Sequence, residues 1–230
     1  FVEIDRFNNV YGFGQTSANN FPTVNSNLVN PGAGQFFIKF DPNLDSVLMS
    51  TTFGDSNLIN ISPTAFLVDR CLNIYASGWG GTLPNTAEPT KILTSTMPLT
   101  NDAFRSTTDQ NDFYLYVMDG AADSLIYGSY FGGTTSDDHV DGGTSRFDKN
   151  GIIYQSVCAS CGPSNRTDFP TNNGFFTRDN GPNCNNAIFK LDFQILPTAR
   201  FTVDQSAFCL NEANNDTITL LITDKSVRSD

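Results

Sequence analysis

The sequence repeats one short phrase three times, and this repetition constrains the fold more than any other feature. Each copy has an Asp and a basic residue, a short turn, and then a β-branched residue followed by Tyr. The Tyr comes six residues after the Asp in every copy: Asp5 and Tyr11, Asp69 and Tyr75, Asp148 and Tyr154. A unit that recurs in this way indicates a repeat architecture in which neighbouring copies pack on one another.

A second phrase follows the first in each unit and ends in another Asp. Its copies are residues 37–41, 115–119 and 188–192. The recurring pieces are short, rich in Val, Ile, Phe and Tyr, and bounded by Asn, Asp, Gly and Pro, which is typical of strands and turns. About four strands per unit, in units of roughly sixty to eighty residues, predict an all-β fold of four-stranded antiparallel propeller blades. An array of β-sandwiches is the alternative, although it explains the four-strand unit less well.

The pattern changes near Pro197. We expect residues 1–196 to form about three blades, the last of them incomplete, and residues 197–230 to begin a second β domain of immunoglobulin-like type. Within that tail, residues 217–223 alternate in the manner of a strand. Because so short a tail cannot build a core of its own, we expect this domain to be truncated and the chain to be an internal piece of a larger protein.

The composition argues against several classes of partner. The 230 residues include 24 acidic and 13 basic side chains, and the formal net charge is -11. A chain this acidic repels phosphate backbones and anionic membrane surfaces, so we expect no nucleic-acid partner. No apolar run approaches the roughly eighteen residues of a membrane span, and no signal peptide opens the sequence, so we also expect no membrane insertion.

The repeated Asp and Tyr residues are interpreted as structural. Asp5, Asp69 and Asp148 precede tight turns, where a carboxylate can accept hydrogen bonds from backbone N–H groups two residues later. A role that recurs in every copy favours structure over ligand binding. The Tyr residues of the same phrase are expected to pack between blades.

The most chemically suggestive segment is acidic and leads into two glycines. Asp137, Asp138 and Asp141 can supply the oxygen ligands that Ca²⁺ prefers. Their spacing does not match an EF-hand loop, so the competing interpretation is a solvated turn that joins two blades. His139 could act as a general base beside one of these carboxylates. A nucleophile at fixed spacing is missing, and we therefore assign no catalytic residue.

Three cysteines flank one long loop in the third unit. Cys158, Cys161 and Cys184 could form a redox motif, a metal site or a disulfide. A redox motif normally opens a helix, which the sequence does not predict here. Zinc would need a fourth ligand in addition to the three cysteines, and His139 is the only His in the sequence. In the blade interpretation all three lie at the same end of one sheet. We therefore expect a disulfide from Cys184 to Cys161, with Cys158 as the alternative partner.

Trp79 is the one aromatic residue in a glycine-rich setting. It directly precedes two glycines and could stack on a sugar. The competing interpretation is a side chain that buries apolar area, as most such aromatic residues do.

Several of these motifs together resemble a known family. The phrases that carry the resemblance are Phe21-Pro22-Thr23, Phe169-Pro170-Thr171, the Asp-to-Tyr phrases and residues 125–133. They are similar to the SBBP repeats of bacterial seven-bladed β-propellers. The tail, with Pro197, Phe201 and Cys209, resembles the opening of a PKD-type domain. The combination is similar to the large, gliding-motility-associated surface proteins that Bacteroidetes export by type IX secretion.

The resemblance implies an extracellular, cell-surface protein. Its function would be a non-enzymatic module for adhesion, display or gliding-associated binding. Its partners would be other blades and domains of the same larger protein, together with surface glycans or proteins, and no cofactor other than Ca²⁺ is expected. The alternative is a carbohydrate-active propeller enzyme, a glycosidase or lyase, which needs paired carboxylates at the mouth of the central channel.

Three Asp-Ser/Thr-hydrophobic triplets look like the acceptor motif for O-glycosylation in Bacteroidetes. Their acceptors would be Ser46, Ser124 and Thr217. So short a motif also occurs in ordinary turns that enter a strand, and this second interpretation applies to each site.

Overall fold

The computed structural model describes residues 1–56, 58–82, 91–140, 145–162, 168–171, 184–193, 201–203 and 222–224. Across these residues the chain forms sixteen strands and no helix, so the predicted all-β class is confirmed. It follows that the described part of the chain contains no helix long and apolar enough to cross a membrane. The chain divides into two compact units, Phe1–Phe193 and Gln194–Asp230.

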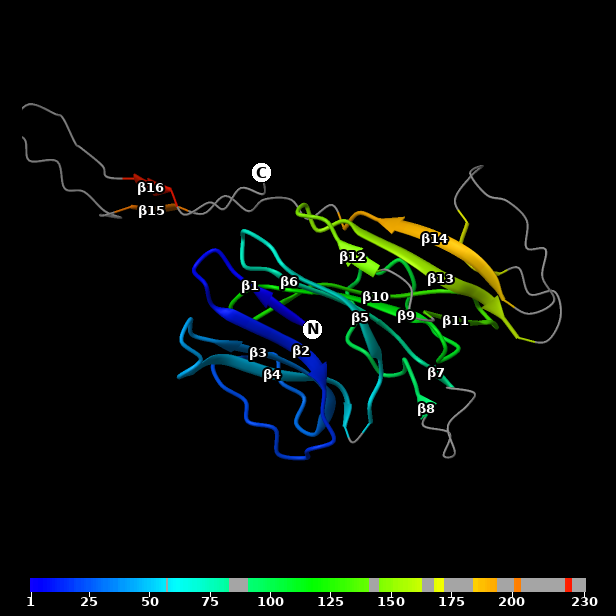
Figure 1. Ribbon diagram of the computed structural model, residues 1–230, viewed down its shortest axis with the longest axis horizontal. Helices are drawn as coiled ribbons and strands as arrows, with labels where there is room; N and C mark the ends of the chain where they lie inside the picture. Colours follow the sequence, from blue (N-terminus) through cyan, green and yellow to red (C-terminus); the bar gives the residue numbers. More distant parts are fainter. Residues whose placement is uncertain are drawn as a thin grey trace, which may run out of the picture. The chain divides into compact units, whose positions relative to one another are not determined.

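The first unit contains two four-stranded antiparallel sheets in which each main strand pairs with the next (Figure 1). The first sheet consists of β1 (Val2–Ile4), β2 (Val10–Gln15), β3 (Ala33–Phe40) and β4 (Val47–Ser56). The second sheet consists of β5 (Ser62–Val68), β6 (Ile74–Trp79), β9 (Phe113–Met118) and β10 (Leu125–Phe131). A short pair, β7 (Gly81–Thr82) and β8 (Lys91–Ile92), lies in the connection from β6 to β9.

The third sheet is built on β13 (Ile153–Cys161). β14 (Asn185–Leu191) pairs with β13 along one edge. Two short strands, β11 (Asp137–His139) and β12 (Ser145–Phe147), pair with successive parts of its other edge. The position that β5 fills in the second sheet is therefore divided into two pieces in the third.

The same turn joins β1 to β2, β5 to β6 and β12 to β13, as the repeated Asp predicts. The Asp5 carboxylate accepts the N–H of Phe7 at 2.8 Å, and the Asp148 carboxylate accepts the N–H of Asn150 at 2.8 Å. The equivalent Asp69 carboxylate accepts the N–H of Asn73 at 2.8 Å. These bonds satisfy backbone donors within the turn, so the structural interpretation of the three Asp residues is confirmed.

The third residue after each Asp has a left-handed backbone. The φ angles are 64° at Asn8, 70° at Leu72 and 78° at Gly151. Glycine adopts this conformation without strain, whereas a residue with a Cβ does not. At Gly151 a side chain is also excluded by space, because an added Cβ would lie 2.7 Å from a ring carbon of Tyr75.

Aromatic side chains pack between successive sheets. Phe37 of β3 lies against Phe66 of β5 and Tyr116 of β9, with ring centroids 5.9 and 5.6 Å apart. On the other face of the second sheet, the ring centroid of Phe131 in β10 lies 4.5 Å from that of Phe189 in β14. The second sheet is therefore covered on both faces, and such buried rings account for much of the apolar area that stabilises the unit.

The first strands of the three sheets are neighbours in space. β5 lies beside β1 and β2 of the first sheet and beside β12 of the third. The second compact unit contains one described hairpin, in which β15 (Phe201–Val203) pairs antiparallel with β16 (Ile222–Asp224).

Candidate functional site

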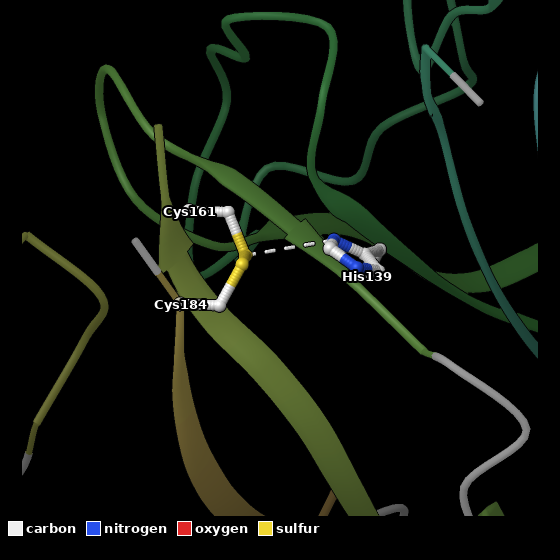
Figure 2. Close-up of side chains that lie close together, drawn as sticks. All are labelled: His139, Cys161 and Cys184. Carbon is white, nitrogen blue, oxygen red and sulfur yellow. Dashed lines mark hydrogen bonds between the residues drawn. A yellow bond between two sulfur atoms is a disulfide. The ribbon is translucent and has the colours of Figure 1, made fainter. Parts of the chain in front are cut away.

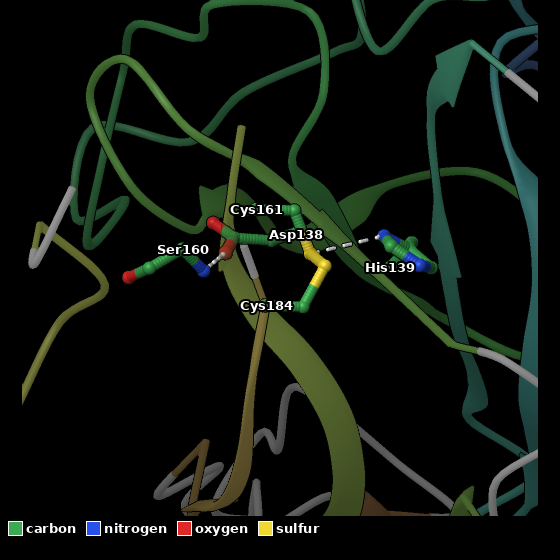
Figure 3. The surroundings of a disulfide bond; sticks show 5 residues. All are labelled: Asp138, His139, Ser160, Cys161 and Cys184. Carbon is green, nitrogen blue, oxygen red and sulfur yellow. Dashed lines mark hydrogen bonds between the residues drawn. A yellow bond between two sulfur atoms is a disulfide. The ribbon is translucent and has the colours of Figure 1, made fainter. Parts of the chain in front are cut away.

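The acidic segment that the sequence singles out lies at the junction between the second and third sheets. Asp138, the middle residue of β11, is fully buried. Its carboxylate accepts the N–H of Gly133 at 2.5 Å and the N–H of Ser160 at 2.8 Å. Figure 3 shows the bond to Ser160. Burial raises the pKa of Asp138 to about 7 even though both hydrogen bonds favour the charged form.

A second carboxylate, Asp112, is buried at the same junction. Its Oδ2 accepts the N–H of Asp109 at 3.3 Å, whereas its Oδ1 accepts no hydrogen bond from the described residues. The nearest described cation is the Arg105 guanidinium, with Nη1 3.6 Å from Oδ1. Burial raises the pKa of Asp112 to about 6, and the neighbouring charge of Asp109 adds to the effect.

Gly132 brings these two carboxylates together. A Cβ added to Gly132 would lie 2.1 Å from Asp112 Oδ1 and 2.8 Å from Asp138 Oδ2. Both oxygens therefore occupy the space next to the Gly132 backbone, which only a residue without a side chain can leave open. Arg105 completes this part of the site by donating to the carbonyl groups of Gly132 and Gly133.

A third carboxylate, Asp168, holds the segment that leads from β10 to β11. Its Oδ2 accepts both the N–H and the hydroxyl of Thr134 and of Thr135, and its Oδ1 accepts the Ser136 hydroxyl at 2.6 Å. Burial alone would raise the pKa of Asp168, but these hydrogen bonds outweigh it and hold the pKa well below its usual range. We call Asp112, Asp138 and Asp168 together the acidic junction.

Of the three predicted calcium ligands, the two that the structure describes do not converge. Asp137 and Asp138 are successive residues of one strand, so their side chains point to opposite faces; Asp138 is buried and Asp137 only partly so. Both oxygens of Asp138 already accept backbone hydrogens. Asp141 lies outside the described residues. Among the described residues, the carboxylates of the acidic junction therefore accept hydrogen bonds from the protein itself. This arrangement gives no support to a calcium loop.

The cysteines form a disulfide beside His139. Cys161, at the end of β13, is bonded to Cys184, which directly precedes β14, and their Cα atoms are 4.2 Å apart. The alternative partner, Cys158, is not in this bond. The His139 Nδ1 lies 3.7 Å from the Cys161 sulfur (Figure 2). His139 therefore faces the disulfide, an arrangement that differs from the general-base pairing considered above.

Trp79 is an interior residue. Its side chain is only 7 % exposed, and its ring centroid lies 5.5 Å from that of His139. Stacking on a sugar needs an aromatic face open to solvent. The structure therefore supports the apolar-packing interpretation of Trp79.

Two of the three predicted glycosylation acceptors lie at exposed turns. The N–H of Ser46 donates to Asp41, and the hydroxyl of Ser124 donates to Asp119 at 2.5 Å. Thr217 lies outside the described residues. The contacts of Ser46 and Ser124 are those of turns that enter strands, and their exposure leaves both positions accessible to modification.

Sequence reasoning missed Asp112, Asp168 and Arg105. Asp168 directly precedes the second Phe-Pro-Thr motif, where Asn20 precedes the first, so its polar character was visible in the sequence. Asp112 directly precedes the buried strand β9, and a carboxylate there is a weak signal. Arg105 lies in a loop with no recurring pattern.

No family model matches this chain, and no curated protein is significantly similar to it.

Proposed function

We propose that this chain is part of a β-propeller that serves as a non-enzymatic module on the cell surface, where it displays or binds other molecules. The observation that carries this proposal is the different burial of equivalent residues on successive sheets. Tyr11, Tyr75 and Tyr154 pair with Lys39, Val117 and Lys190, respectively, so they hold the same register position. Tyr11 is 0 % and Tyr75 is 4 % exposed, whereas Tyr154 is 37 % exposed.

The surroundings of the covered Tyr residues indicate what kind of unit would cover Tyr154. Tyr75 packs against Phe147 of the third sheet, with ring centroids 5.7 Å apart, and against the backbone of Gly151 in the turn of that sheet. A unit of the same kind, with the same Asp-headed turn, would cover Tyr154 in the same way. Sheets that stack face to face with their first strands adjacent are what a propeller requires.

A second position on the same face supports this argument. Phe37 and Leu115 are fully buried, and the equivalent residue of the third sheet, Ile188, is 79 % exposed. Exposed apolar groups in a contiguous patch favour an interaction surface. The proposed occupant of this face is another four-stranded unit of the same repeat.

One observation favours the alternative function, a glycosidase or lyase, and another argues against it. Asp112 and Asp138 do converge beside Gly132, as two catalytic carboxylates would. Both side chains have no exposed surface, however, and a glycosidase must bring its carboxylates into contact with the sugar. The buried pair therefore favours the non-enzymatic function.

The SBBP-type and PKD-type assignments, the type IX export and the surface location belong to the same proposal. They rest on the sequence motifs, and the exposed Ser46 and Ser124 turns are compatible with a glycosylated surface protein. The acidic composition agrees with glycan or protein partners better than with nucleic acid.

The test combines location with activity. Intact cells of the source organism would be labelled with an antibody against the chain, and the purified protein would be incubated with a panel of polysaccharides. We expect labelling of intact cells, and no release of reducing ends or unsaturated sugars. Sugar release that disappears in the Asp138→Asn variant would establish the enzyme instead, and cells that label only after lysis would contradict the surface location.

A further inference from the structure

Three metal-binding side chains meet at the end of the third sheet. One ligand atom each from His139, Cys161 and Cys184 can be chosen so that all three lie within 4.8 Å of one another (Figure 2). They come from three separate segments: β11, the end of β13, and the residue before β14. In the oxidised protein the two sulfurs bond to each other and cannot act as thiolate ligands.

We propose that reduction of the Cys161–Cys184 disulfide converts this cluster into a zinc site with His139, Cys161 and Cys184 as ligands. The inference is independent of the proposed surface function. It assigns two alternative states to one place in the fold, a disulfide under oxidising conditions and a metal centre under reducing ones.

The conversion requires a two-electron reductant and then the release of two protons. A dithiol reductant transfers two electrons and two protons to the disulfide and becomes a disulfide itself, leaving Cys161 and Cys184 as thiols. Zn²⁺ then displaces one proton from each thiol and forms two Zn–S bonds. Neutral His139 supplies the lone pair of Nδ1, with its proton on Nε2, and water takes the fourth position.

The distances suit a tetrahedral ion. Zn–S bonds of roughly 2.3 Å and Zn–N bonds of roughly 2.0 Å place the N and S ligands of a tetrahedral site roughly 3.5 Å apart. The observed separation of His139 Nδ1 from the Cys161 sulfur is 3.7 Å. The imidazole therefore needs little movement, and the main change is the separation of the two sulfurs once their bond is broken.

The surroundings favour a cation at this place. Trp79 packs on one side of His139, which limits the positions that the imidazole can take. Asp137 and Asp138 directly precede His139 on β11, Asp137 on the same face of the strand as His139, and the chain as a whole carries a net charge of -11. Cys161 is buried whereas Cys184 is exposed, so a reductant and then a metal ion can reach the site from the Cys184 side.

The metal would do more than replace the disulfide. The disulfide joins only the ends of β13 and β14, but a zinc ion on all three residues would also tie β11 to them. The site would therefore hold the edge of the third sheet together while the protein is in a reducing compartment, before the disulfide forms.

Cobalt binding provides a direct test, because Co²⁺ bound to thiolates gives charge-transfer absorption and, when tetrahedral, intense visible bands. The protein would carry Ser in place of Cys71, Cys158 and Cys209, so that only Cys161 and Cys184 remain as thiols. After reduction with a phosphine under argon, we expect one Co²⁺ per chain, displaced by one Zn²⁺. The oxidised protein should give neither band, which ties the signal to the disulfide.

The His139→Ala variant distinguishes this site from adventitious binding by two thiols. We expect it to bind Zn²⁺ at least about tenfold more weakly, since one of three protein ligands is lost. Zinc should also raise the melting temperature of the reduced protein but not of reduced His139→Ala. Absence of tetrahedral cobalt bands, or equal zinc affinity with and without His139, would overturn the proposal.

Discussion

Asn60 and Asp138 hold equivalent positions at successive junctions between sheets. The Asn60 Oδ1 accepts the N–H of Asp55 at 2.6 Å, and the Asp138 Oδ2 accepts the N–H of Gly133 at 2.5 Å. Each acceptor comes six residues after the Gly of a repeated Phe-Gly pair, and both are fully buried. The equivalent backbone N–H group therefore donates a hydrogen bond to a neutral amide at one junction and to an ionisable carboxyl group at the next.

This difference predicts that, of the two junctions, only the second has a buried acceptor whose titration makes stability depend on pH. Burial raises the pKa of Asp138 to about 7 and that of Asp112 to about 6, above the value of about 3.9 in an unfolded chain. The folded state therefore binds more protons than the unfolded state between about pH 4 and 7. The free energy of unfolding should fall across this range as pH rises, by up to about 1.4 kcal/mol per pH unit for each proton involved.

Urea unfolding of the oxidised protein at several pH values measures this effect. The Asp138→Asn variant should show a flatter profile, because the amide does not titrate. It should also be less stable than wild type at pH 5, since Asn cannot accept the hydrogens of both Gly133 and Ser160. Asp45→Asn, at an exposed turn, is the matched control and should keep the wild-type profile. Parallel profiles for wild type and Asp138→Asn would contradict the prediction.

The disulfide should stabilise the oxidised protein by closing a loop in the unfolded chain. Cys161 and Cys184 are 23 residues apart in the sequence, and a loop of this size corresponds to about 3 kcal/mol. We expect the Cys161→Ser, Cys184→Ser double variant to lose about this much in urea unfolding. Cys158→Ser should change the free energy of unfolding by less than about 1 kcal/mol. The assigned pairing fails if Cys158→Ser is the more damaging change.

The left-handed turn residues predict opposite effects for two substitutions. Gly151→Ala introduces a Cβ at φ 78° and against the ring of Tyr75, so it should destabilise the protein by more than about 1 kcal/mol. Leu44→Gly removes a side chain from an exposed position at φ 63°, so it should be neutral or stabilise by up to about 1 kcal/mol. Thermal unfolding of the two variants measures both effects. A Leu44→Gly variant that is less stable than wild type would contradict the prediction that the left-handed backbone of Leu44 is strained.

The features that sequence alone predicted are those that local chemistry determines. The Asp5, Asp69 and Asp148 turns depend on a carboxylate, its nearby N–H groups and one left-handed residue, all within a few positions of the chain. The strand phrases are likewise local, because alternation and β-branched residues favour extended backbone wherever they occur. The all-β class and its antiparallel four-stranded sheets followed from these repeated pieces.

The acidic junction could not be predicted in this way, because its members come from distant parts of the chain. Asp112 precedes β9, Asp138 lies in β11, and Asp168 follows β13. They meet only after the second and third sheets pack. Sequence periodicity also could not decide whether Cys158 or Cys161 pairs with Cys184. Ser160 has a left-handed φ of 54°, which interrupts the alternation of side-chain directions along β13.

We propose that the exposed face of the third sheet is covered by a further unit of the same repeat in the protein as its source organism makes it. This coverage is tested by the reactivity of a single thiol, with Ile188→Cys placed in a Cys71→Ser, Cys158→Ser, Cys209→Ser background in which Cys161 and Cys184 remain disulfide-bonded. Maleimide labelling would be compared between the 230-residue chain and the protein as its source organism makes it, with Leu44→Cys, at an exposed turn, as the control. We expect Cys at position 188 to react at least about tenfold more slowly in the native protein and the control to react equally in both. Equal reactivity at position 188 in the two forms would mean that no further unit covers this face of the third sheet.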